Sequence, residues 1–270
     1  MKTLVIGDTS QLAQYFDSTN TVKISSRLPN FLDYSTQQWD TVYICFAEQR
    51  TYLAQEPNMQ SEFGRVNYHK TLEVIKEFMP CSRRVVYYST AELWNNTVGA
   101  VDMNTPFSFH QNHYTISKYD ITHELQDKSR YPNVSICYPF NFNSVYRRYD
   151  YLMGKVFRSI IESKPIVIGD VDYFRDMTHP YYVVTDDIGR KIGEDYISGT
   201  GNLVHVGRFI ERLYLELEMS FDKYVQIKPG PSSIYRKNIF YAAINQKNCN
   251  VLKDTIAELK EEKEHYESFR

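Results

Sequence analysis

Short apolar runs alternate with longer segments of helical period over roughly the first half of the chain. The runs that indicate buried strands are KTLVIG (2–7), TVKISS (21–26), DTVYICFA (40–47), RRVVYYST (83–90) and NVSICYPF (133–140). Helical patterns begin at SQLAQYF (10–16) and cover EFGRVNYHKTLEVIKEFM (62–79) and NHYTISKYDITHELQDKS (112–129). Alternation of this kind is typical of βαβ units, which build a parallel sheet with helices on both faces. We therefore predict an α/β fold with a doubly wound parallel sheet.

The pattern is less regular after residue 140. It predicts helices at about 149–163 and 186–197, strands at PIVIGD (165–170) and LVHV (203–206), and a charged amphipathic helix over 251–269. We expect residues 1–145 to form the first domain, with a return of the chain to it at about 181–206. Residues 146–180 and 207–270 would then form a smaller C-terminal lobe.

Composition excludes several classes of function. The net charge of −2 gives no reason to expect nucleic acid or an anionic membrane as a partner. No apolar run approaches the roughly 20 residues that span a bilayer, and the N-terminal segment lacks the pattern of a signal peptide. The four cysteines are scattered, as expected for reduced thiols in a cytoplasm, and the seven histidines show no metal-ligand spacing. We expect a cytoplasmic protein without a metal.

The predicted strands place several polar residues at one edge of the sheet, because the carboxyl ends of parallel strands meet there. Gly7, Ser25–Arg27, Ala47, Ser89–Thr90 and Pro139–Asn141 all follow predicted strands. Ligands of such sheets bind in the crevice beyond these carboxyl ends. The edge is therefore the predicted binding site.

The turn after the first strand, GDTSQLA (7–13), is a candidate phosphate loop. A dinucleotide fingerprint here would read GxxGxxG, and only Gly7 of its three glycines is present. Backbone N–H groups at a following helix N-terminus would hold a phosphate, although Asp8 is unfavourable beside an anion. An ordinary strand-to-helix turn explains the segment equally well. The candidate cofactor residues are Gly7, Thr9, Ser10, Gln11 and Leu12.

The second predicted strand ends in Ser25-Ser26-Arg27. A carboxylate at this place accepts hydrogen bonds from a ribose 2′-hydroxyl, whereas hydroxyl groups with an arginine suit a 2′-phosphate. If a dinucleotide binds, Ser26 and Arg27 favour NADP over NAD. The alternative is a solvated turn.

Tyr114 and Lys118 lie four residues apart in YTISK, so they share one face of the predicted helix. The pKa of a free phenol is about 10, and a neighbouring cation lowers it, which makes a phenol a usable proton donor or acceptor. Thr90, at a strand end, would hydrogen-bond the same substrate oxygen. Taken alone, the YxxxK motif could also be a pair of residues on the surface of a helix. The combination of this motif with a glycine turn after the first strand and a Ser-Thr strand end favours an active site.

In this order the motifs resemble those of the extended short-chain dehydrogenase/reductase family, particularly its nucleoside-diphosphate-sugar epimerases, dehydratases and reductases. GDTSQLA is similar to the family's GxxGQLG, YYSTAELW to SSxEVYG, and YTISK to YxxSK. VNYHKTLEVI resembles NxxGTxNLL through Asn67, ICYPFN resembles RxxNVYGP, and YFRDMTH resembles RDFxH/Y. The likeness covers most of the chain. It implies a Rossmann domain that binds NAD or NADP and a lobe that binds a nucleotide sugar.

The resemblance also implies roles for single residues. Thr90, Tyr114 and Lys118 correspond to the catalytic trio, and Lys118 would also hold the nicotinamide ribose. Asp33 matches an aspartate that contacts adenine, and Ala47 lies where the family has a cofactor-contacting segment. Glu92 follows Thr90 where dehydratases carry an acid pair, and it would act as a base or anchor the strand end. Because Ala91 supplies no acid, a reductase or epimerase is favoured over a dehydratase.

The substrate side departs further from the family. Phe142-Asn143-Ser144 replaces the expected YGP, and the aspartate expected soon after the RD pair corresponds to Asp187 only with extra residues between. Among the basic residues of the smaller lobe, each of which a solvated surface also explains, Arg175 and Arg236 are candidates for a diphosphate, with Asn141 nearby. The family's pairing across helices implies a homodimer through segments 62–79 and 112–129.

Two functions follow from these patterns. The first is a cytoplasmic NAD(P)-dependent oxidoreductase or epimerase that acts on a nucleoside-diphosphate sugar. The second is a non-catalytic protein of the same fold that serves as a binding or regulatory module, which the incomplete glycine loop motivates.

Overall fold

The computed structural model describes residues 2–228, 239–244 and 249–268. The chain divides into two compact units. The first consists of Met1–Asn96, Met103–Pro139 and Val184–Ser198, and the second of Thr97–Asp102, Phe140–Val183 and Gly199–Arg270. Residues 97–102 and 140–145, which we expected in the first domain, belong to the second unit.

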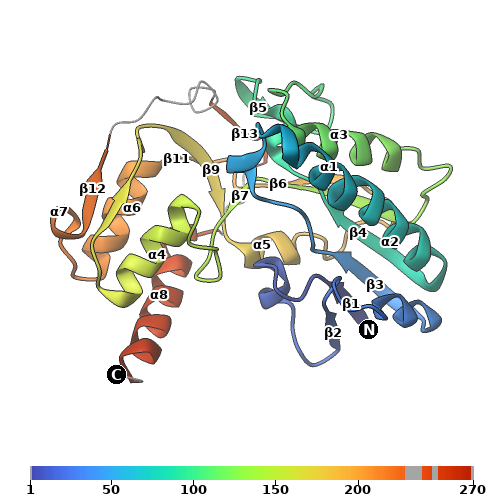
Figure 1. Cartoon of the computed structure of the whole chain (residues 1–270), viewed down its shortest axis with the longest axis horizontal. Helices are drawn as coiled ribbons and strands as arrows, with labels where there is room; N and C mark the ends of the chain where they lie inside the picture. Colours follow the sequence, from blue (N-terminus) through green and yellow to red (C-terminus); the bar gives the residue numbers. More distant parts are fainter. Residues whose placement is uncertain (1, 229–238, 245–248, 269–270) are drawn as a thin grey trace. The chain divides into compact units, whose positions relative to one another are not determined.

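The first unit contains a six-stranded sheet in the order β10-β6-β4-β3-β1-β2, with every neighbouring pair parallel (Figure 1). Its strands are β1 (Thr3–Ile6), β2 (Thr21–Ile24), β3 (Trp39–Ile44), β4 (Ser82–Tyr88), β6 (Val134–Pro139) and β10 (Tyr196–Ser198). The central strands are buried on both faces, which explains their continuous apolar runs. The predicted α/β fold with a parallel sheet is confirmed.

The strand order has a topological switch point beside Gly7. From β1 the chain crosses to β2 on one side and then reaches β3 on the other, so the topology switches between β1 and β3. Crevices at such switch points bind ligands. The order is that of dinucleotide-binding sheets without their outermost strand, because the segment between β2 and β3 forms the 3-10 helix η2 (Phe31–Thr36) instead.

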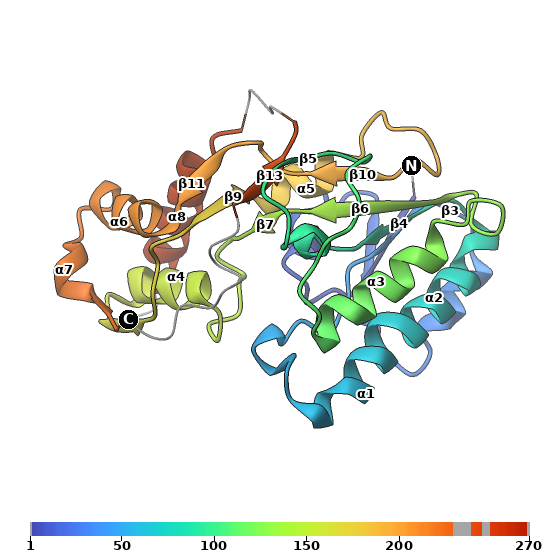
Figure 2. The same cartoon turned by 90° about the horizontal axis from the view of Figure 1, so that it is seen from above.

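A nearly continuous helical segment follows β3 and covers one face of the sheet (Figure 2). It consists of α1 (Gln60–Phe63), the π-helix η5 (Gly64–Lys70) and α2 (Thr71–Phe78). Helix α3 (His113–Leu125) packs beside η5. A capping box begins α3: Asn112 Oδ1 accepts from the Thr115 amide at 2.9 Å, and Thr115 Oγ1 accepts from the Asn112 amide at 3.1 Å. The predicted helices over 62–79 and 112–129 are confirmed.

Two segments that were predicted as helices do not form α-helices. The segment after β1 forms only the four-residue 3-10 helix η1 (Leu12–Tyr15), because the polar residues that follow it satisfy their own backbone. There, Asp17 Oδ1 accepts from the Thr19 amide at 3.0 Å. The segment predicted as a helix over 186–197 consists of turns followed by β10, and helix α5 (Pro180–Thr185) lies before it. Gly189 and Gly193 take positive φ angles of 83° and 77°, which a helix does not allow.

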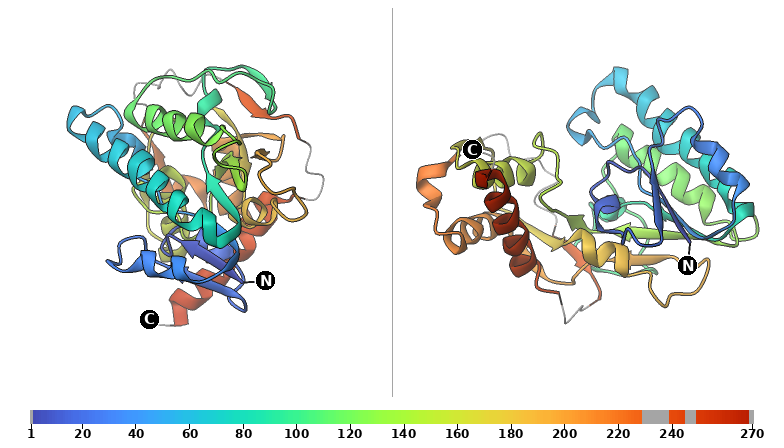
Figure 3. Two further views of the ribbon diagram at one scale, coloured as in Figure 1. Left: turned by 90° about the vertical axis from the view of Figure 1, so that its right-hand side faces the viewer. Right: turned by 90° about the horizontal axis from the view of Figure 1, so that it is seen from below.

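The described part of the second unit contains three small sheets, with strand orders β11-β9-β7, β12-β8 and β13-β5. Their strands are β5 (Gly99–Val101), β7 (Asn141–Phe142), β8 (Ile166–Ile168), β9 (Phe174–Thr178), β11 (Leu203–His205), β12 (Val225–Ile227) and β13 (Phe240–Ala242). Its other helices are α4 (Leu152–Glu162), α6 (Val206–Glu216), α7 (Phe221–Tyr224) and α8 (Val251–Ser268), the last drawn red in Figure 3. Apolar faces of α4, α6 and α8 form its core around Phe157, Ile210 and Leu259. No helix in the described part of the chain is long and apolar enough to cross a membrane.

A fully buried carboxylate, Asp176 on β9, joins three segments of the second unit. Its Oδ1 accepts from the amide and hydroxyl of Thr200 at 2.9 and 2.6 Å. Its Oδ2 accepts from the amides of Gly201 and Ala242, each at 3.0 Å. Four donors are what a buried carboxylate needs in place of water. This aspartate of the YFRDMTH motif therefore stabilises the unit.

Candidate active site

Thr90 lies at the carboxyl end of β4 and begins the 3-10 helix η7 (Ala91–Trp94). It is 7% exposed, and its Oγ1 accepts a hydrogen bond from the Glu92 amide at 3.1 Å. Because Oγ1 acts as the acceptor in this bond, its own proton remains available to a bound oxygen. The preceding residue, Ser89, hydrogen-bonds Thr122 of α3 at 2.7 Å and so ties the strand end to that helix.

The Glu92 carboxylate takes part in a chain of hydrogen bonds. Its Oε2 accepts from Asn95 Nδ2 at 2.9 Å, and Asn95 Oδ1 accepts from the His110 amide at 2.8 Å. This chain connects the end of β4 to the segment that leads into α3. Of the two roles left open by the sequence, the contacts support that of an anchor for the strand end.

Aromatic packing holds the same connection in place. The Trp94 ring lies 5.0 Å from that of Phe107 and 5.1 Å from that of Tyr138, and its indole N–H donates to the Thr105 carbonyl at 2.9 Å. Aromatic pairs of this kind contribute roughly 0.5–1.5 kcal/mol each beyond the area they bury. Thr90 and the start of α3 are therefore held by a rigid loop.

The Lys118 ammonium reaches the carboxyl end of β4 from α3. The side chain is buried, and its Nζ donates to the Tyr87 phenol oxygen at 3.1 Å and the Tyr88 carbonyl at 2.9 Å. Burial lowers the pKa of the ammonium to about 7, since a low-dielectric environment disfavours its charged form. Lys118 therefore titrates near neutral pH, and its acceptor Tyr88 lies two residues before Thr90.

Tyr114 lies one helical turn before Lys118 and is half-buried, with its ring edge to face with Phe63 at 6.2 Å. It is near enough to Tyr87 for the two phenols to interact. Burial first, and then Tyr114, raise the pKa of Tyr87 well above its usual value. Two phenols and an ammonium thus gather where β4 meets α3.

Sequence reasoning missed Tyr87, although the strand period contained a signal. Side chains of a strand alternate between its faces. Tyr87 and Ser89 both contact α3, whereas Tyr88 stacks on Tyr43 of the neighbouring strand. Counting back from the contact of Ser89 would have assigned Tyr87 to the face of Lys118.

Asn67, in η5, connects the loop after β3 to α3. It is 1% exposed, and its Oδ1 accepts from the Glu48 amide at 2.7 Å. Its Nδ2 donates to the Glu48 carbonyl at 3.2 Å and to Ser117 Oγ at 3.1 Å. One side chain thus holds the loop that contains Ala47 and the residue before Lys118.

The candidate phosphate loop requires its glycine, and several of its backbone amides already donate hydrogen bonds within the protein. Gly7 has a φ of 111°, and a Cβ there would lie 2.7 Å from the Phe46 nitrogen, so no other residue fits. The amides of Gly7 and Asp8 donate to the Ile24 carbonyl at 2.8 and 3.2 Å. The amide of Ser10 donates to the Gly7 carbonyl at 2.9 Å.

Two further features of this loop disfavour a phosphate. The Leu12 amide donates to Ser10 Oγ at 3.2 Å, and the Asp8 Oδ1 atom is buried without a hydrogen-bond partner in the described structure. The helix that follows is too short to supply the dipole of a full helix. Thr9 is exposed, whereas Gln11 is buried with Leu12. The loop thus fits a diphosphate poorly.

A second cation, which sequence reasoning missed, reaches the end of β2 from a neighbouring helix. Lys70, at the end of η5, donates from Nζ to the Ser26 carbonyl at 2.5 Å. Its ammonium also lies over the rings of Phe31 and Phe46, at 5.3 and 5.7 Å from their centroids. Arg27 follows Ser26 directly and is exposed. Asp33, the expected adenine contact, is exposed in η2.

The residues present fit the two ends of a nicotinamide dinucleotide better than its centre. Thr90, Tyr114 and Lys118 gather at one end of the crevice, and Ser26 and Arg27 lie at the end of β2. In the loop between them, the amides of Gly7, Asp8, Ser10 and Leu12 already donate to acceptors within the protein. The candidate residues at the two ends of this sheet edge are therefore the ones that suit a dinucleotide best.

Asn141 and Arg175, two candidate substrate residues, lie on one sheet of the second unit. Asn141 of β7 pairs in register with Met177 of β9, two residues after Arg175. The Arg175 guanidinium stacks on the Tyr173 ring at 4.8 Å, and its Nη1 donates to the Phe174 carbonyl at 2.7 Å. The third candidate, Arg236, lies outside the described residues.

Asp187 has a structural environment in the first unit. Its Oδ2 accepts from the Tyr43 hydroxyl at 2.5 Å and lies 3.3 Å from Arg84 Nη1. Burial raises the pKa of Asp187, although Tyr43 and Arg84 both stabilise its charged form. A charged pair buried under the sheet needs this close geometry to offset desolvation.

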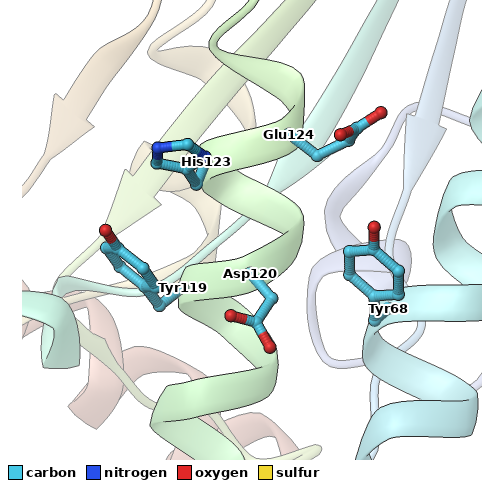
Figure 4. Close-up of a pocket in the computed structure, with 5 residues that line it drawn as sticks. All are labelled: Tyr68, Tyr119, Asp120, His123 and Glu124. Carbon is cyan, nitrogen blue, oxygen red and sulfur yellow. The ribbon is translucent and has the colours of Figure 1, made fainter.

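A pocket of about 510 Å³ lies on the outer side of α3 and η5, and Thr90, Tyr114 and Lys118 are not among its lining residues. It is lined by Tyr68, Tyr119, Asp120, His123 and Glu124. Figure 4 shows four of these side chains projecting from α3 and Tyr68 from the neighbouring helix. This pocket lies within the segments 62–79 and 112–129, for which the sequence predicted a homodimer interface. Among the described residues, no group of three or more His, Cys, Asp or Glu side chains could hold a metal ion.

Comparisons with known proteins give matches in structure alone. No model of a protein family matches the chain, and no curated protein matches it in sequence. RMD from Pseudomonas aeruginosa, solved with NADPH, superposes with a TM-score of 0.75 at 15% identity, over 98% of this chain and 100% of that one.

Two further solved structures cover both chains completely. The dTDP-glucose 4,6-dehydratase DesIV from Streptomyces venezuelae, solved with NAD, gives a TM-score of 0.73 at 15% identity. The UDP-glucuronic acid 4-epimerase from Bacillus cereus, solved with UDP-glucuronic acid and NAD, gives 0.76 at 16% identity. By its structure, the chain has the Rossmann-type fold of these epimerases and dehydratases, and differs from them widely in sequence.

Proposed function

We propose that this chain is an NAD(P)-dependent enzyme that acts on a nucleoside-diphosphate sugar, exchanging a proton between Tyr114 and a hydroxyl or ketone of the sugar. One observation carries the proposal. Thr90, Tyr114 and Lys118 come from two elements of the first unit, and the Lys118 ammonium is bonded to the strand that ends at Thr90. A fold does not need all three groups in this arrangement for its stability.

The three side chains would divide the work at the reacting oxygen. Thr90 donates a hydrogen bond from its hydroxyl to that oxygen and so orients it. Tyr114 gives or takes the proton as the bond order of the carbon–oxygen bond changes. Lys118 stabilises the phenolate form of Tyr114 through its charge, and the two β4 acceptors hold its ammonium in place. When bound, the nicotinamide would supply or accept the hydride.

The environment of Glu92 favours a reductase or an epimerase over a dehydratase. Its carboxylate is bonded to Asn95, and Ala91 offers no acid for a departing hydroxyl. Elimination of water needs both a base and an acid near the sugar. An oxidation or reduction at a single carbon needs, besides a nicotinamide to give or accept the hydride, only the three side chains Thr90, Tyr114 and Lys118.

The solved structures of the same fold support the cofactor and the substrate class. RMD was solved with NADPH, DesIV with NAD, and the Bacillus cereus epimerase with UDP-glucuronic acid and NAD. We infer a nicotinamide dinucleotide in the crevice between β1 and β3. Among the described residues, Asn141 and Arg175 are the candidates for binding the sugar nucleotide.

Titration of the purified chain with NAD, NADH, NADP and NADPH tests the proposal. We expect at least one of the four to raise the melting temperature and, for the reduced forms, to change the nicotinamide fluorescence. Incubation with UDP- and dTDP-sugars then separates the reactions: a reductase changes the nicotinamide absorbance, whereas an epimerase changes the sugar without net consumption of cofactor. The proposal fails if none of the four dinucleotides binds.

A second function, binding without turnover, is favoured by the phosphate loop. The amides of Gly7, Asp8, Ser10 and Leu12 are all bonded within the protein, so a dinucleotide would gain little from them. A non-catalytic module predicts binding of a sugar nucleotide with no dependence on any nicotinamide. Calorimetry with UDP-glucose in the presence and absence of NADPH distinguishes the two functions.

A further inference from the structure

We propose that Lys70 and Arg27 form a subsite for the 2′-phosphate of NADP, with Lys70 as the residue that discriminates NADP from NAD. The inference rests on the proposed function, since it concerns the cofactor of the same crevice. It assigns a role to a helix residue for which the sequence motifs gave none.

The position of Lys70 is the first observation that supports the subsite. Its Nζ donates to the carbonyl of Ser26, which belongs to the peptide bond that joins Ser26 to Arg27. The ammonium is therefore held beside the backbone at the carboxyl end of β2. In dinucleotide-binding sheets this is the place where the protein reads the 2′ position of the adenosine ribose.

The contacts of Lys70 hold its side chain without neutralising it. Phe31 and Phe46 contribute ring faces, and Ser26 contributes a carbonyl oxygen. None of these groups carries a negative charge. A half-buried lysine with such partners loses rotamer freedom before a ligand arrives, so less entropy is lost on binding an anion.

The charges near Lys70 are mostly positive. Burial and then Arg65 lower its pKa, Glu73 raises it, and Arg27 lowers it further. Arg65 is paired with Glu62 at 2.8 Å. In the described part of the chain, neither Lys70 nor Arg27 forms an ion pair with a carboxylate. Two cations without an ion-pair partner among the described residues thus lie near the end of β2.

The group at the ribose 2′ position, a phosphate in NADP and a hydroxyl in NAD, decides which of the two cofactors the subsite favours. A 2′-phosphate brings close to two negative charges and three acceptor oxygens, which match a guanidinium and an ammonium. A 2′-hydroxyl would instead ask for an acceptor, such as a carboxylate at the end of β2. Ser25, Ser26 and Arg27 supply no carboxylate there. The subsite is therefore complementary to NADP.

Binding of the reduced cofactors, followed by nicotinamide fluorescence, tests the subsite without any turnover. In the unmodified chain we expect NADPH to bind about tenfold or more tightly than NADH. Lys70→Gln keeps a donor for the Ser26 carbonyl and removes the charge. It should weaken NADPH binding by about tenfold and leave NADH binding unchanged. Lys76→Gln, an exposed lysine of α2, is the matched control and should change neither.

Competition with 2′,5′-ADP and 5′-AMP provides an independent reading. Only the first carries the 2′-phosphate, so its advantage should disappear in Lys70→Gln. Equal binding of NADPH and NADH to the unmodified chain overturns the subsite while leaving the proposed function intact. Equal weakening of both cofactors by Lys70→Gln also overturns it, because Lys70 would then only support the loop. Absence of binding by all four dinucleotides, NAD and NADP included, would instead overturn the proposed function.

Discussion

The Lys118 ammonium lies 3.1 Å from the phenol oxygen of Tyr87, a residue three positions before Thr90 on the same strand. The phenol accepts from the ammonium, and the Tyr88 carbonyl accepts from it as well. Both contacts pull Lys118 to the end of β4. The charge that would assist Tyr114 is thus positioned by the strand that carries Thr90.

Replacement of two adjacent tyrosines should separate this contact from simple packing. Tyr87→Phe removes the acceptor of a charged donor and should lower the free energy of unfolding by about 1–2 kcal/mol. Tyr88→Phe removes a buried hydroxyl that has no hydrogen-bond partner in the described structure, so it should be neutral or stabilising. Urea unfolding of both variants measures the difference. Equal destabilisation would show that Lys118 does not depend on Tyr87.

The buried lysine should give the protein a distinctive dependence on pH. The pKa of Lys118 is about 7 in the folded chain, against about 10.4 when exposed in the unfolded chain. Between these values the unfolded state binds more protons, so stability rises with pH across this window. From pH 6 to pH 10 the unmodified chain should gain about 4 kcal/mol relative to Lys118→Met.

Denaturant unfolding of both proteins at the two pH values checks this, because other titrating groups cancel in the difference. Lys118→Met also leaves the Tyr88 carbonyl without its donor, which shifts the two curves by a constant. Parallel curves over the whole range would mean that Lys118 is not desolvated.

The phenol of Tyr114 should be essential for turnover and dispensable for binding. Tyr114→Phe removes the exchangeable proton and keeps the ring against Phe63. General acid–base groups contribute roughly 100- to 10,000-fold to rates, so kcat should fall in that range with cofactor affinity unchanged. Tyr119→Phe changes the same helix on the side of the outer pocket and should retain full activity. Undiminished turnover by Tyr114→Phe would remove the phenol from the mechanism.

The buried pair of Arg84 and Asp187 should dominate the electrostatic contribution to stability. Asp187→Asn leaves the guanidinium of Arg84 buried without its counter-charge, and should cost about 3 kcal/mol or more of unfolding free energy. Glu216→Gln breaks an exposed pair with Arg212, whose side chains are 61% and 49% exposed for Arg212 and Glu216, and should cost under about 1 kcal/mol. Thermal and urea unfolding compare the two. Similar small effects would place Asp187 in contact with water.

The sequence predicted the sheet well because burial on both faces leaves continuous apolar runs such as VVYY (85–88). It failed for the segment predicted as a helix at 186–197, where the deciding contact is remote. A Cβ on Gly193 would lie 2.3 Å from the Pro132 carbonyl oxygen, and no local pattern contains that information. A periodic pattern with two glycines was mistaken for a helix.

The candidate site was predicted where it depends on spacing along one element. Tyr114 and Lys118 share a face of α3 because they are four residues apart. Lys70 and Tyr87 were missed because each makes its contact at the end of a long side chain that reaches another element. Which neighbour such a side chain meets depends on the packing of η5 and α3 on the sheet.

The π-helix η5 implies a sensitivity that no substitution would reveal. A π-turn holds one residue more than an α-turn, and each residue of a helix turns it by about 100°. Loss of one residue within Gly64–Lys70 would therefore restore a regular α-helix and rotate one half against the other. Asn67, which holds the loop after β3, and Lys70, at the end of β2, could then no longer face their partners together. Deletions and insertions in this helix, rather than point mutations, should be the changes that homologous sequences avoid.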